Sequence, residues 1–121
     1  MKDGDFLNKL EQQIKKGLLE IAILSILKAR DCYGYELIHQ LDELSKGAFI
    51  LKEGTLYPIL YRLEDGKYIQ SYWKTESTTR SKPRKYYKIT EEGIDTYKNA
   101  KESFFTITNG LTNIINSGSE E

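Results

Sequence analysis

The segment from Leu18 to Leu27 limits the possible folds more than any other part of the chain, because it is apolar on nearly every side of a helix. Eight of its ten residues are Leu, Ile or Ala. A helix without a polar face must be enclosed by other elements. In a chain of 121 residues, the size of one domain, the segment predicts a central core helix from about Asp5 to Ala29.

The N-terminal half of this helix has only one apolar stripe, and its remaining sides are polar. Such a stripe predicts packing against a partner. We therefore expect this half to project from the domain as an arm that contributes to a dimer interface. The stripe consists of Phe6, Leu7, Leu10 and Ile14.

Two further helices predict a helix-turn-helix. The second opens at Tyr33-Gly34-Tyr35 and ends before Gly47, and the third runs from Glu53 to Gly66. We expect Thr55 to cap the third helix, Pro58 to occupy a third helical position that needs no N–H, and Gly66 to end it. Its apolar face has the i, i+3, i+4, i+7 spacing of one helical side: Leu56, Ile59, Leu60 and Leu63.

Beyond Gly66 the apolar period changes from helical to alternating, which predicts two strands. The strands cover about residues 68–73 and 84–90, with a polar loop between them. From Lys67 to Lys88 there are seven basic residues and one acid, so this window carries +6 although the whole chain is formally neutral. The fold class is therefore mainly α with a small β-hairpin, a winged helix-turn-helix in residues 1–90.

The charge pattern favours DNA binding by the third helix and the hairpin. Gly54 and Thr55 would bring backbone N–H groups to a phosphate, and the tyrosines and Arg62 could contact phosphates or bases. Packing of Tyr57 or Tyr61 against the wing is an equal alternative. The candidate DNA contacts are Tyr33, Tyr35, Lys52, Gly54, Thr55, Tyr57, Pro58, Tyr61, Arg62, Arg80, Lys82, Arg84 and Lys85.

The last predicted helix, residues 91–116, opens at the cap residue Thr90 and carries a seam of apolar residues spaced by seven. The seam is too short for an independent coiled coil, so we expect it to pack against the N-terminal arm and the same helix of a second chain. Packing within one chain is the alternative. Residues 117–121 read as a disordered tail. The seam consists of Tyr97, Ala100, Phe104, Ile107, Leu111 and Ile114.

In this order the segments resemble the PadR family of bacterial transcriptional regulators. The resemblance extends from Gly17 to about Thr96 and is carried by Tyr33-Gly34-Tyr35-Glu36-Leu37, Glu53-Gly54-Thr55-Leu56-Tyr57-Pro58, Tyr61-Arg62-Leu63-Glu64 and Pro83 to Gly93. It implies a cytoplasmic, nucleoid-associated, homodimeric repressor on a two-fold related operator in double-stranded DNA. The single last helix resembles the compact subfamily.

Some compact members bind flat aromatic effectors between the subunits through a tryptophan on the last helix. This chain differs, because its only tryptophan, Trp73, lies on a predicted wing strand and the last helix has Phe104 and Phe105. A small aromatic effector is therefore an expectation from the resemblance alone.

The sequence argues against an enzyme, a cofactor, a metal site and a membrane protein. His39 and Cys32 each lack a companion for metal binding. We expect Cys32 to be a small apolar filler, with a redox sensor as the alternative. No apolar run approaches the roughly 20 residues of a membrane span. The serious alternative function is a winged-helix adaptor that binds protein and no DNA.

Overall fold

The computed structural model describes residues 2–75 and 82–118. Along the chain the elements are α1 (Lys2–Ala29), β1 (Cys32–Tyr33), α2 (Gly34–Leu44), α3 (Glu53–Asp65), β2 (Ile69–Lys74), β3 (Arg84–Ile89) and α4 (Glu91–Ser117). The expected fold class, mainly α with a small β-hairpin in a winged helix-turn-helix, is confirmed. Within the described ranges, no helix is both long and apolar enough to cross a membrane.

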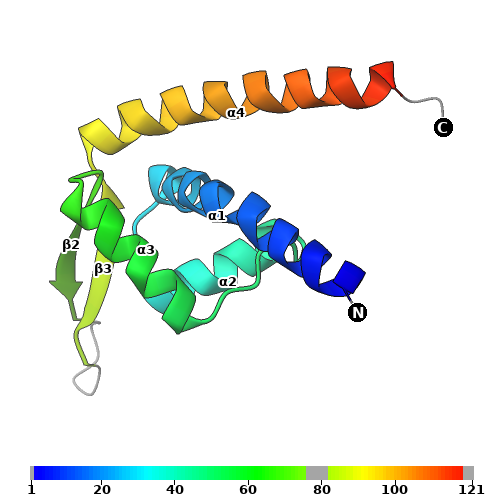
Figure 1. Cartoon of the computed structure of the whole chain (residues 1–121). Coiled ribbons are helices and arrows are strands. Elements are labelled where there is room, and N and C mark those ends of the chain that lie inside the picture. Colours follow the sequence, from blue (N-terminus) through cyan, green and yellow to red (C-terminus); the bar gives the residue numbers. More distant parts are fainter. Residues whose placement is uncertain (1, 76–81, 119–121) are drawn as a thin grey trace.

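The C-terminal half of α1 is the centre of the core, as its apolar composition predicted. Figure 1 shows α1 between α4 on one side and α2 on the other. Its apolar side chains pack against the buried stripes of α2 and α3 and against Ile69 and Tyr87 of the sheet. The α1 residues in this core are Leu19, Ile23, Leu24, Ile26 and Leu27.

The sheet has three antiparallel strands in the order β1-β3-β2. The sequence predicted β2 and β3 but not β1, whose two residues are too few to show an alternating pattern. Cys32 and Tyr33 pair with Tyr87 and Tyr86 of β3. β1 therefore attaches the wing to the start of α2.

Two details of α3 differ from the prediction. Its N-cap is Lys52, which makes no side-chain capping bond, so the expectation of Thr55 as cap was wrong. Pro58 is consequently the sixth helical residue and not the third, and the usual bond from residue 58 to the carbonyl of Gly54 is not formed. The helix still ends where predicted, at the Gly66 C-cap.

The start of α4 is fixed to the wing by Thr90 and Gly93. Thr90 Oγ1 accepts a hydrogen bond from Gly93 N at 3.0 Å, which confirms the predicted cap. Gly93 lies so close to the Tyr68 carbonyl that a Cβ would overlap that oxygen. From this anchor α4 extends past α1 (Figure 1) to Ser117, the first residue of the predicted tail, and residues 119–121 lie outside the described residues.

Candidate nucleic-acid interface

Helix α3 exposes a side of small residues and one tyrosine. Its buried side holds the four apolar residues predicted for it. Gly54, Pro58 and Tyr61 are exposed on the opposite side, and at Gly54 no other atom comes within 4 Å of a Cβ position. A helix with this outer profile can approach another backbone closely.

The two tyrosines of α3 have different environments. Tyr61 is 55% exposed, whereas Tyr57 is half-buried and its hydroxyl end lies against Gly34 at the start of α2. Burial, with a smaller contribution from the Glu53 charge, raises the pKa of Tyr57. Tyr61 is therefore free to reach a ligand, while Tyr57 joins α3 to α2.

Arg62 is exposed and already has an anionic partner. Its Nη2 lies 3.1 Å from Oε2 of Glu20 on α1. The two residues are 42 positions apart, so no local sequence pattern indicates this pairing. The ion pair joins α3 to α1 at the surface.

At the loop end of the wing, Arg84 is held against the start of α2. Its guanidinium carbon lies 4.6 Å from the centre of the Tyr33 ring, and its Nη1 donates to Tyr33 Oη at 3.1 Å. The Tyr33 N–H in turn donates to Glu36 Oε1 at 3.2 Å. The structure therefore brings together Tyr33 and Arg84, which the sequence had placed on separate segments of the interface.

A row of three tyrosines crosses the sheet at one register, from Tyr33 through Tyr86 to Tyr72. The ring centres of Tyr33 and Tyr86 lie 5.3 Å apart, and those of Tyr72 and Tyr86 lie 5.7 Å apart. Tyr72 Oη donates to Asp31 Oδ2 at 2.6 Å, and this bond raises the pKa of Tyr72 to about 12. The sequence did not predict this row, because it needs the unpredicted strand β1.

The remaining candidate DNA contacts differ in how exposed their side chains are. Lys52 and Lys82 are exposed, and so are Thr55 and Tyr35. Lys85 is half-buried, with its ammonium group 5.7 Å from the centre of the Tyr87 ring. Arg80 lies outside the described residues. All described DNA candidates except the half-buried Tyr33, Tyr57 and Lys85 are therefore exposed.

Most of the predicted dimer residues form two apolar surfaces that the chain itself leaves open. Tyr97 is the exception, because it is buried against α1 and its hydroxyl donates to Ser25 Oγ at 3.1 Å. Ala100 and Phe104 are half-buried. The remaining members are exposed: Phe6, Leu7, Leu10 and Ile14 on α1, and Ile107, Leu111 and Ile114 on α4.

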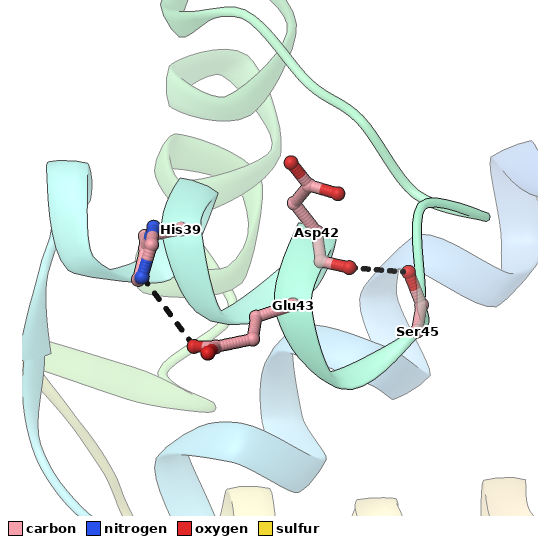
Figure 2. A network of polar contacts seen from close by, with 4 residues as sticks. All are labelled: His39, Asp42, Glu43 and Ser45. Carbon is pink, nitrogen blue, oxygen red and sulfur yellow. Dashed lines mark hydrogen bonds and ion pairs between the residues drawn. The ribbon is translucent and has the colours of Figure 1, made fainter.

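His39 lies on the surface of α2, and the described residues contain no cluster of metal-binding side chains around it. Figure 2 shows His39 paired with Glu43 one turn along α2, at 3.4 Å, on the surface. In the same view Asp42 uses its backbone carbonyl to accept from Ser45 Oγ. Residues 2–75 and 82–118 contain no group of three or more His, Cys, Asp or Glu side chains that could hold a metal ion.

Cys32 lies on strand β1, and its side chain is buried in the core cluster. This burial raises the pKa of its thiol. A thiol with a raised pKa is protonated at neutral pH and reacts slowly, because the thiolate is the nucleophile. The structure supports the packing role.

The chain is similar to known transcriptional regulators in sequence and in structure. The family model described as "Transcriptional regulator PadR-like family" matches residues 23–99, which include α2, α3 and the wing. A PadR family transcriptional regulator from Eggerthella lenta has 27% identity and a TM-score of 0.81, over 95% of this chain and 96% of that chain. A transcriptional regulator from Clostridium thermocellum has 34% identity and a TM-score of 0.77, over 85% and 98%. "Uncharacterized protein X" of Lysinibacillus sphaericus is 34% identical over 84 residues, 69% of this chain and 75% of that protein.

Proposed function

Because the chain belongs to the PadR-like family of transcriptional regulators, we propose that it represses transcription as a homodimer bound to a two-fold related operator. The observation that carries the proposal is the exposed side of α3, with Gly54, Pro58 and Tyr61 outward and the basic wing next in sequence. In a dimer, each α3 would enter a major groove, and the two helices would be about 34 Å apart.

Contacts around α3 would position the protein on the DNA backbone. The Arg84–Tyr33 pair presents a guanidinium beside the start of α2, and Lys82 extends this basic surface along the wing. Such contacts release counterions and make affinity depend on salt. Base reading is left to Tyr61, Thr55 and Arg62, which are exposed on α3.

Dimerisation is supported by the continuity of the two open apolar surfaces with the contact between α1 and α4. Phe104 and Leu111 follow Tyr97 at intervals of seven, so they continue the face on which Tyr97 meets Ser25. Ile14 precedes Ser25 by eleven residues, about three turns of the same helix. A second copy would cover both surfaces in one two-fold interface.

A small aromatic effector would act at the same interface. Phe104 and Phe105 have ring centres 5.1 Å apart in an edge-to-face arrangement, and Phe105 is exposed. A flat molecule between two such pairs would alter the spacing of the α3 helices. A screen for compounds that release bound operator tests this part of the proposal.

Replacing Arg62 tests the DNA-reading role of α3. With an operator selected from a random pool, Arg62→Ala and Tyr61→Ala are each expected to weaken binding by about 1–3 kcal/mol per base contact. Arg62→Lys keeps the charge but loses bidentate geometry, so it separates guanine reading from phosphate contact. Fluorescence anisotropy with labelled duplex measures the operator affinity of each variant.

The control for these variants is Lys98→Ala, which removes a positive charge from exposed α4. Unchanged affinity in both the Tyr61 and Arg62 variants would refute the placement of α3 in the groove. A chain that selects no sequence and shows negligible duplex affinity at low salt would favour the adaptor function.

A further inference from the structure

A hollow of about 660 Å³ lies between α1 and α3. The proposed function assigns no ligand to it. The segment 49–51, which connects α2 to α3, forms its third side. We call it the α1–α3 hollow. Its floor is apolar, with Leu19, Phe49, Leu51 and Ile59, and its polar and basic lining is Gln12, Lys15, Lys16, Thr55 and Arg62.

The α1 residues of this hollow lie on the opposite side of the helix from the open apolar stripe. Gln12, Lys15, Lys16 and Leu19 are spaced i, i+3, i+4, i+7 and share one face. At 3.6 residues per turn, this face and the stripe from Phe6 to Ile14 point roughly 180° apart. A second copy seated on the stripe would therefore leave Lys15 and Lys16 accessible.

We propose that the α1–α3 hollow receives the sugar–phosphate backbone of the operator, with Lys15 and Lys16 bound to phosphates. The inference rests on the proposed DNA binding and adds α1 to the interface. The hollow is continuous with the DNA-facing side of α3, because Gly54, Thr55 and Pro58 line it as well. From Gln12 to Leu19 the helix rises about 10 Å, which is long enough to run beside two neighbouring phosphates of one strand.

The mixed lining of the hollow fits this occupant. A nucleic-acid backbone alternates anionic phosphates with apolar sugar faces, and the hollow offers lysines at its edge and apolar side chains below. Two ammonium groups on adjacent residues attract phosphate without reading bases. The contact would therefore add affinity and register but no sequence preference.

Glu20, which is paired with Arg62, competes with DNA phosphate for the Arg62 guanidinium. In the free protein Glu20 Oε2 lies 3.1 Å from Arg62 Nη2, and Arg62 lines the hollow. A phosphate in the hollow would take over the guanidinium from this carboxylate. Glu20 thus positions Arg62 before binding and opposes the DNA charge during binding.

The double variant Lys15→Gln/Lys16→Gln tests the two phosphate contacts. Glutamine has nearly the same helix propensity as lysine, so the fold should be preserved. The slope of log affinity against log salt should fall by about 1.8, and affinity near physiological salt by about 10- to 30-fold, equally for all operator sequences. Lys9→Gln/Lys98→Gln removes the same charge from exposed positions outside the hollow and should change both quantities much less.

The opposite result is expected for Glu20→Gln, which frees Arg62 and removes a negative charge. Operator affinity should rise about threefold, since exposed ion pairs contribute up to about 1 kcal/mol, while Glu11→Gln should change it little.

An unchanged salt slope in the Lys15/Lys16 variant, matched to its control, overturns the inference while leaving DNA binding by α3 intact. A parent protein without duplex affinity instead refutes the proposed function.

Discussion

The Leu111→Asp variant is expected to be monomeric and to lose at least a hundredfold in operator affinity. Leu111 is 53% exposed in the single chain and belongs to the α4 seam, so the proposed second copy would bury it. A carboxylate at position 111 would lose its hydration without gaining a partner in the interface. The cost of this desolvation exceeds the several kcal/mol of interface energy. A monomer binds one half-site and loses the effective concentration that links the two.

Asn113→Asp is the matched control, because it adds the same charge to an exposed position of α4 off the heptad seam. Sedimentation velocity gives the oligomeric state of both variants, and circular dichroism checks that α4 stays helical. A Leu111→Asp protein that sediments as the parent does would refute dimerisation through α4. Monomers with full operator affinity would separate dimerisation from DNA binding.

Gly93→Ala is expected to destabilise the fold by about 3 kcal/mol, the upper range for overpacking. Its Cβ would overlap the backbone oxygen of Tyr68 and approach Ile89. A backbone oxygen cannot move to another rotamer as a side chain can, so the start of α4 would have to shift away from the wing. Thermal unfolding at matched protein concentration should show a melting temperature about 10 °C lower.

Gly110→Ala in the same helix provides the comparison. No atom lies within 4 Å of a Cβ built at Gly110, so only helix propensity changes, and the variant should gain about 0.5–1 kcal/mol. Equal stability of the two variants would mean that α4 is not held against Tyr68 as described.

Local patterns were sufficient for most of the fold. The apolar run from Leu18 to Leu27 could only be enclosed, and this half of α1 is the centre of the core. The spacing of Leu56 to Leu63 assigned the buried side of α3 correctly, and Thr90 capped the helix that it precedes. These features depend on residues within two turns of each other, so the chain encodes them without reference to distant contacts.

Features that depend on distant residues were missed. β1 exists because Cys32 and Tyr33 meet β3, more than 50 positions along the chain. The cap of α3 was misassigned to Thr55, since the path from Ala48 to Lys52 is set by the packing of Phe49 and Leu51 on the core. The spacing of apolar residues along the sequence gives no information about contacts between such distant residues.

For the candidate site, the sequence by itself determined the helix, its outward residues and the basic hairpin that follows it, because each is a local pattern of side chains. Only the tertiary structure decided what these residues do in the free protein. It buried part of Tyr57 against Gly34, joined Arg84 to Tyr33, and set Arg62 between Glu20 and an open hollow. The physical reason is that partners of a charged or aromatic side chain are chosen by proximity in space, and burial and charge pairing are properties of the packed molecule.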